Sequence, residues 1–121
     1  MRIGIVGSRR RAAKKDRALV FDIVQNAPSG AVIVSGGCPT GADAFAEMAA
    51  DEYGHEMVIH LPEPVPADSP RWVWSKAFYA RNQIVAEDVD VLYALVARNR
   101  KGGTESTIRF AEKAGTLTKL K

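Results

Sequence analysis

Two glycine-rich segments of this 121-residue sequence have the composition of turns that bind anions. The first, from Ser35 to Asp43, reads SGGCPTGAD, and the second, from Gly102 to Thr107, reads GGTEST. Glycine lets the backbone approach a ligand closely, and the neighbouring serines and threonines add hydroxyl groups. Each segment leads into a pattern typical of a helix, whose first N–H groups attract anions. The candidate binding residues are Ser35, Gly36, Gly37, Thr40, Gly41 and Asp43 in the first segment and Gly102, Gly103, Thr104 and Thr107 in the second.

A third candidate turn, Gly7-Ser8-Arg9, follows the first apolar run of the chain. Its serine hydroxyl and the forked donors of arginine both suit a phosphate group. The turn lacks the G-x-G-x-x-G pattern, which disfavours a standard dinucleotide site. The net charge of +3 and the isoelectric point of about 9.2 agree with an anionic ligand or with a solvated basic surface. The basic residues form two clusters, which are Arg9, Arg10, Arg11, Lys14, Lys15 and Arg17, and Arg98, Arg100 and Lys101.

The segment 71–86 carries an arginine in the middle of an apolar helical stripe. Arg81 stands about one helical turn from Phe78 and from Val85, and its neighbour Asn82 is also polar. A buried arginine is costly unless it is paired. Arg81 therefore either pairs with an internal carboxylate or points into a ligand crevice, and we favour the crevice for Arg81 and Asn82.

Carboxylates are scarce in the two glycine-rich segments, where only Asp43 and Glu105 occur. Asp43 either caps a helix or contacts a ribose hydroxyl, and the helix dipole alone accounts for a glutamate at position 105. With Arg81 to orient a phosphate, they are the candidate catalytic residues for cleaving a base–ribose bond. Cys38 has no histidine base nearby in the sequence, so we expect it to be a bystander. One cysteine and two histidines exclude an internal disulfide and predict no metal site, and we expect no cofactor.

Strand and helix patterns alternate along the whole chain. Continuous apolar strands predict a parallel sheet that is covered on both faces, and right-handed crossovers then give an α/β, doubly wound, Rossmann-like domain over residues 1–121. Ligands bind such sheets at the carboxyl ends of the strands, where the loops after the first and fourth strands face each other in a 3-2-1-4 order. The expected strands are 2–6, 31–35, 56–61, 89–96 and 116–120, and the expected helices are 14–27, 42–53, 71–86 and 104–114.

Composition adds expectations about location and assembly. Hydrophobic residues make up 46% of the sequence, no apolar run is long enough to span a bilayer, and the N-terminus shows no secretory pattern. We therefore expect a cytoplasmic protein without membrane contact. The segment 71–86 carries more large apolar residues than one sheet face needs, including Trp72, Trp74 and Tyr79, which predicts a homodimer.

Together these residues resemble the SLOG superfamily, and most closely its YspA-related branch. The superfamily is Rossmann-like and includes the LOG nucleotide phosphoribohydrolases and the DNA-processing protein DprA. The resemblance covers nearly the whole chain and implies a nucleotide or nucleotide-derived ligand in the crevice. Its marks are Gly7-Ser8-Arg9, Gly36-Gly37 through Gly41-Ala42-Asp43, Trp72 or Trp74 ahead of Arg81-Asn82, and Gly102-Gly103-Thr104.

The resemblance also bears on catalysis. In LOG enzymes an arginine and a glutamate support cleavage of the N-glycosidic bond of a nucleoside monophosphate, and Arg81 matches that arginine. The glutamate belongs to a P-G-G-x-G-T-x-x-E motif, but residues 101–109 read KGGTESTIR, so Glu105 lies at a different phase of the helix. We therefore expect a nucleotide sensor or sequestering protein with slow or absent hydrolysis. A LOG-like N-glycosidase and a DprA-like single-stranded DNA binder are the alternatives.

Overall fold

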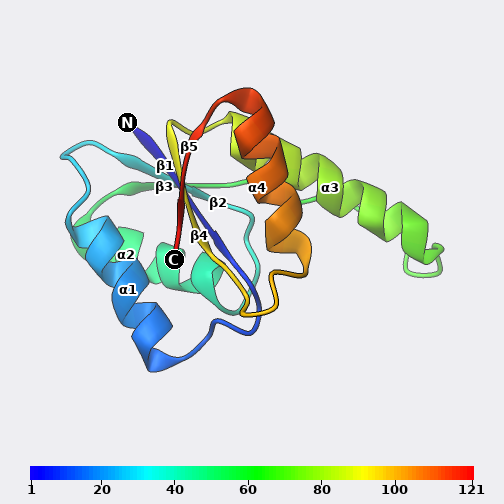
Figure 1. Ribbon diagram of the computed structural model, residues 1–121, viewed down its shortest axis with the longest axis horizontal. Helices are drawn as coiled ribbons and strands as arrows, with labels where there is room; N and C mark the ends of the chain where they lie inside the picture. The colour runs from blue at the N-terminus through cyan, green and yellow to red at the C-terminus, as the bar shows by residue number, and fades with distance from the viewer.

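The computed structural model describes residues 1–121 and contains one five-stranded sheet (Figure 1). All neighbouring strands are parallel, and their order across the sheet is β3-β2-β1-β4-β5. This arrangement confirms the predicted parallel Rossmann-like fold, with the fifth strand added beside β4. The strands are β1 (Arg2–Gly7), β2 (Val32–Ser35), β3 (Glu56–Ile59), β4 (Val91–Leu95) and β5 (Leu117–Leu120).

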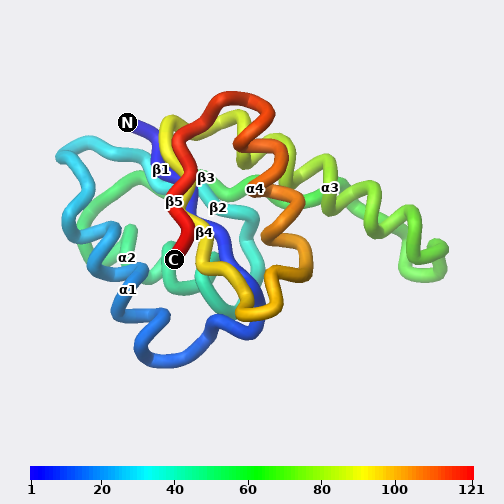
Figure 2. Tube along the Cα trace, in the orientation of Figure 1, coloured from blue at the N-terminus to red at the C-terminus, as the bar shows by residue number.

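Four helices cover the two faces of the sheet. Helices α1 and α2 pack on one face and α3 and α4 on the other, as the chain trace also shows (Figure 2). None of the helices combines the length and the apolar content needed to cross a bilayer. The helices are α1 (Lys14–Gln25), α2 (Ala42–Tyr53), α3 (Arg71–Glu87) and α4 (Gly103–Ala114).

The element boundaries differ from the predicted ones by one or two residues in several places. Strand β3 stops at Ile59 because β2 ends at Ser35, whose carbonyl accepts the His60 N–H as the last ladder contact. Helix α3 runs on to Glu87, which delays the start of β4 to Val91. Ladder partners are set by neighbouring strands, so a sequence pattern alone overestimates a strand whose partner is short.

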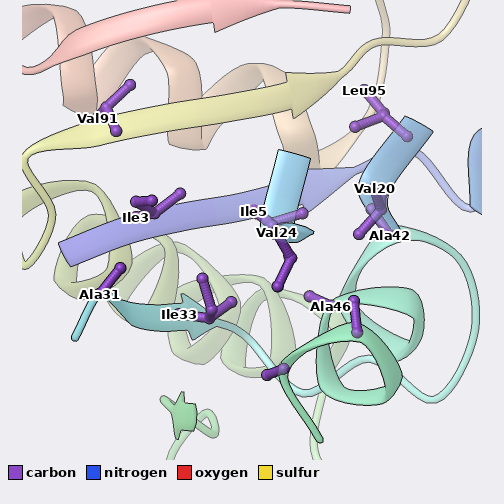
Figure 3. Close-up of a cluster of buried hydrophobic side chains, with 12 residues drawn as sticks. Ile3, Ile5, Val20, Val24, Ala31, Ile33, Ala42, Ala46, Val91 and Leu95 are labelled. Carbon is purple, nitrogen blue, oxygen red and sulfur yellow. The ribbon is translucent and has the colours of Figure 1, made fainter. Parts of the chain in front are cut away.

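Two apolar clusters hold the layers together. Successive residues of a strand point to opposite faces, so Ile3 and Ile5 of β1 pack under α1 and α2 while Val6 packs under α3 and α4. Figure 3 shows the first cluster, in which Val20 and Val24 of α1 close over the sheet. Burial on both faces explains why the strands are almost continuously apolar.

Helix α3 differs from the other helices because only its C-terminal half is packed. Asn82, Val85 and Ala86 are its buried residues, and the N-terminal half projects beyond the body of the protein (Figures 1 and 2). Trp72 is 67% exposed and Tyr79 is 50% exposed. The apolar residues of 71–86 therefore exceed what this fold buries.

Candidate functional site

A cavity of about 800 Å³ lies beyond the carboxyl ends of β1, β2 and β4. This volume falls within the range typical of small-molecule sites, and the position is the one predicted from the winding of the sheet. The cavity brings residues of all three predicted turns and of α3 together. The predicted site residues that line it are Gly7, Ser8, Arg9, Gly36, Gly37, Asp43, Arg81, Asn82, Gly102, Gly103, Thr104 and Thr107.

Four predicted site residues lie outside the cavity lining. Ser35 is fully buried beneath the first turn, where its Oγ accepts the Gly37 N–H at 3.4 Å. Thr40 Oγ1 lies 4.0 Å from Cys38 Sγ, and Gly41 precedes α2 with a φ of 75°. The carboxylate of Glu105 is bound by Arg100, which lies just before the second glycine-rich segment, and Glu105 does not line the cavity.

Asp43 supplies the only carboxylate in the cavity lining. It lies inside α2 and does not cap that helix, contrary to one of the predicted roles, because Gly41 is the N-cap and Asp43 Oδ2 instead accepts the Cys38 N–H at 3.0 Å. Asp43 is only 8% exposed. Burial raises the pKa of Asp43 above its usual value, although the Cys38 N–H and the charge of Arg81 act in the opposite direction. Asp43 is therefore placed to accept a hydrogen bond from a ligand.

Arg81 lines the cavity, as predicted, and its guanidinium is hydrogen-bonded to two groups of the protein. Its Nη1 donates to the Gly36 carbonyl at 2.6 Å and its Nε donates to Asn82 Oδ1 at 3.0 Å. The guanidinium carbon lies 5.8 Å from the centre of the Phe78 ring. A Cβ at Gly36 would lie 2.7 Å from Nη1, so a larger residue here would displace the guanidinium from its present position. Arg81 takes part in none of the ion pairs of the structure.

The second glycine-rich turn is open by comparison. A Cβ at Gly102 or Gly103 would meet no other atom within 4 Å. The N-cap of α4 is Gly102, so the helix begins at Gly103, one residue before the predicted start at 104, and a φ of 117° at Gly102 allows this entry. Lys101 lines the cavity. The first N–H groups of α4 and the Lys101 ammonium thus combine into an electropositive wall.

Arg100 and Glu105 account for the remaining charges of this turn. Arg100 has a φ of 54°, and its Nε and Nη2 donate to the Glu105 carboxylate at 2.9–3.1 Å. The hydrogen bond from Arg100 to Glu105 raises the pKa of the guanidinium. Glu105 therefore stabilises the conformation of the turn.

The basic segment after β1 divides into a structural and a cavity-facing part. Arg11 Nε donates to Asp16 at 2.7 Å, and its Nη1 donates to the carbonyls of Val96 and Lys121 at 2.9 Å each. Burial opposes ionisation of Asp16, but the hydrogen bonds from Arg11 and a backbone N–H bring its pKa below the usual value. Arg9 and Arg10 line the cavity. Only part of the sequence cluster is thus available to a ligand.

Gly7 serves packing as well as the cavity. A Cβ at this position would lie 2.8 Å from Ala42 Cβ and 3.0 Å from Leu95 Cβ. The glycine therefore lets α2 and β4 close on the end of β1. Backbone proximity to a ligand is not needed to explain it.

Sequence reasoning missed an apolar part of the cavity lining. Phe78 was assigned to the helical stripe without a role, yet its ring faces the cavity from α3. Leu61 and Pro62 line the same cavity from the loop after β3. The signal that indicates Leu61 and Pro62 is their position after the end of β3, because the loops beyond parallel strand ends share one edge of the sheet. No group of three or more His, Cys, Asp or Glu side chains could hold a metal ion.

Several solved structures share this fold. DNA processing protein A (DprA) from Streptococcus pneumoniae has a TM-score of 0.78 and 20% identity over 98% of this chain and 49% of that chain. The molybdenum cofactor binding protein from Rippkaea orientalis has a TM-score of 0.75 and 23% identity over 98% and 74% of the two chains. The molybdenum cofactor carrier protein from Chlamydomonas reinhardtii has a TM-score of 0.74 and 24% identity, also over 98% and 74%.

The comparisons define the fold of the chain. The similarity to DprA agrees with the SLOG resemblance of the sequence and confirms the Rossmann-like fold that it implied. This chain spans about half the length of the DprA structure. No family model and no curated protein matches the sequence. The function therefore has to be argued from the site.

Proposed function

We propose that this protein is a cytoplasmic binding protein for a nucleotide or a nucleotide-derived ligand, which it senses or sequesters. The observation that carries the proposal is the single cavity onto which both glycine-rich turns open. One wall offers N–H groups and cations, another a buried carboxylate, and a third an aromatic ring. A nucleoside phosphate has groups that match all three.

The phosphate fits best against the second turn. Gly102 and Gly103 leave room for an anion beside the start of α4, and Thr104 adds a hydroxyl. Arg9 and Lys101 line the cavity and supply positive charge. This part of the proposal needs no side chain to leave an existing partner, since neither cation is in an ion pair of the structure.

The nucleoside fits against the first turn and α3. Asp43 is placed to accept a hydrogen bond from a ribose hydroxyl, and the Arg81 guanidinium offsets its charge. Phe78 and Leu61 provide apolar surface for a base. Solved structures with this fold are named as cofactor-binding and cofactor-carrier proteins, which supports small-molecule binding as a use of the fold.

Calorimetric titration tests the proposal. Purine and pyrimidine nucleoside mono-, di- and cyclic phosphates should be compared. At least one is expected to bind with a dissociation constant between micromolar and millimolar, which corresponds to a binding free energy of about −4 to −8 kcal/mol. Absence of binding by every member of the panel at millimolar concentration would contradict the proposal.

We expect the bound nucleotide to be hydrolysed slowly or not at all. Cleavage of a base–ribose bond needs a carboxylate that can activate water or stabilise the developing charge on the ribose. Arg100 holds the Glu105 carboxylate outside the cavity, and the remaining carboxylate, Asp43, already accepts the Cys38 N–H. Free base should be assayed by chromatography after incubation with adenosine, guanosine and cytidine monophosphates. Robust base release that disappears in Asp43→Ala or Glu105→Ala would instead make the protein an N-glycosidase.

Single-stranded DNA is the second candidate ligand. Arg9, Arg10 and Lys101 line the cavity together with Phe78, and proteins that bind single strands combine basic and stacking groups in this way. DprA, named as a DNA processing protein, shares the fold. An oligonucleotide that binds far more tightly than its mononucleotides, with strong salt dependence, would favour this candidate.

A homodimer through α3 completes the proposal. Uncharged residues recur at helical spacing along α3 and form a stripe that consists of Val73, Ala77, Ala80 and Ile84. The last of them, Ile84, is 50% exposed. Two copies can pair along this uncharged stripe. Light scattering should give twice the 13.1 kDa chain mass, and Ile84→Glu should give the monomer. A monomer mass for the unmodified protein at all concentrations would contradict the dimer.

A further inference from the structure

A chain of side-chain hydrogen bonds connects the two glycine-rich turns through α3. It begins at the Gly36 carbonyl, which accepts Arg81 Nη1 at 2.6 Å, and continues from Arg81 Nε to Asn82 Oδ1 at 3.0 Å. Asn82 Nδ2 then donates to Ser106 Oγ at 2.7 Å, and Ser106 Oγ donates to the Gly103 carbonyl at 2.8 Å. Gly36 and Gly103 belong to different turns but to one cavity.

The centre of this chain is buried where an apolar contact would be expected. Asn82 is 8% exposed and Ser106 is 2% exposed, both at the packing of α3 against α4. Burying an amide and a hydroxyl costs free energy unless each finds partners. Here every buried side-chain nitrogen and oxygen has a partner. Such a complete buried network restrains the groups that it joins more tightly than an apolar contact would.

The oxygen and the nitrogen of the Asn82 amide contact groups that support different turns. Its Oδ1 accepts the Nε of Arg81 and so fixes the plane of the guanidinium, whose Nη1 holds the first turn. Its Nδ2 donates to Ser106 and, at 3.4 Å, to the Gly103 carbonyl, at the start of α4. One side chain therefore contacts the supports of both turns.

We propose that Asn82 is the positioning residue that sets the separation of the two turns, and that it thereby selects ligands that reach both. This inference rests on the proposed function. A ligand that spans the cavity gains from turns held at a fixed separation, because it loses less freedom on binding to an ordered site. An anion held by the second turn alone gains little.

The expected effect of Asn82→Ala is selective. The affinity for a bound nucleoside monophosphate should fall by about tenfold, which corresponds to 1.4 kcal/mol and is about the contribution of one hydrogen bond. The affinity for inorganic phosphate, the probe of the second turn alone, should change by about twofold or less. Gln83→Ala is the matched control, since Gln83 lies next in the helix and bonds only the exposed Glu87.

Amide chemical shifts of the ligand-free protein test the link directly. In Asn82→Ala the amides of Gly36 and Gly37 and those of Gly103 and Thr104 should shift together, while Gln83→Ala leaves both sets in place. Ser106→Ala, a smaller change for which folding is less at risk, should shift the second set and, through Asn82, the first. Shifts confined to one turn in both variants would overturn the inference. This readout needs no ligand, so failure of all nucleotides to bind would contradict the proposed function and leave the shift test decisive for the link.

Discussion

The two glycine-rich turns of this site are alike in composition and opposite in construction. In the turn after β2, the space around Gly36 is filled by Arg81, and the N–H of Cys38 is bound by the buried Asp43. In the turn after β4, Gly102 and Gly103 face open space. The turn after β2 is therefore occupied by side chains of the protein itself, whereas the turn after β4 is open at the start of α4.

This difference assigns different ligand chemistry to the two turns. Free N–H groups at a helix start together with Lys101 favour an anion. A buried carboxylate repels an anion and accepts hydrogen bonds, so Asp43 favours the hydroxyl or N–H donors of a neutral group. Glycine content therefore indicates a turn but not its use, which depends on what already occupies it.

The largest expected effect is on the filled turn. Arg81→Ala should weaken nucleotide binding by roughly 1.5–3 kcal/mol, because a charge-assisted contact is lost at a site that needs positive charge. Thermal unfolding should show a smaller loss of stability, since the side chain is only half-buried. If the variant unfolds while its remaining folded fraction binds normally by calorimetry, Arg81 is a structural residue only.

Paired glycine substitutions test the contrast between a filled and an open turn. Gly36→Ala places a Cβ 2.7 Å from Arg81 Nη1, so the guanidinium must move and give up its hydrogen bond to the Gly36 carbonyl. The free energy of unfolding should fall by about 1–3 kcal/mol. Gly103→Ala meets nothing within 4 Å at a position without positive φ, and should leave stability unchanged or raise it by about 0.5 kcal/mol. Urea unfolding measures both. Equal losses would show that the two turns do not differ in packing.

The buried carboxylate gives the contrast a dependence on pH. Because burial raises the pKa of Asp43 in the folded state, this residue lowers stability as pH rises from the unfolded pKa of about 3.9 through the folded value. Asp43→Asn should therefore raise the free energy of unfolding at pH 7 by about 0.5–2 kcal/mol, with the gain vanishing below pH 4. Nucleotide affinity should fall in the same variant. A constant gain at all pH values would contradict the assignment.

The smallest effect is expected at the open turn. Lys101→Ala should weaken nucleotide binding by about 0.3–1 kcal/mol, as removal of one solvent-exposed charge near a helix start does. The difference from the unmodified protein should shrink as salt is added from 50 to 500 mM, because exposed charges are screened over about 10 Å or less. A loss that is large and independent of salt would place Lys101 in a buried contact instead.

The fold was predictable because its signals are local. Continuous apolar runs such as the one around Ile33 indicate strands covered on both faces, and Gly54 and Gly115 end α2 and α4 in the left-handed conformation expected of helix ends. The position of the cavity followed from the strand order, and Arg81 was expected to line it because a charge stood in an apolar stripe. These features depend on few long-range contacts.

What escaped prediction depends on contacts between distant segments. The pairing of Arg11 with the carbonyls of Val96 and Lys121 separates it from its cavity-facing neighbours, and no sequence pattern joins residues that far apart. Phe78 escaped because an aromatic residue at helical spacing looks the same whether it faces a core or a cavity. The link from Asn82 to Ser106 requires the packing of α3 on α4 and is invisible in either helix alone.

The central claim, that both turns form one ligand site, is tested most directly by amide chemical-shift mapping during titration with a nucleotide that binds by calorimetry. The account predicts that the amides of residues 36–38 and 102–107 shift along the same binding curve, with one dissociation constant. The amides of α1, none of whose residues lines the cavity, should stay in place. Shifts in only one turn, or two turns with different dissociation constants, would contradict the claim.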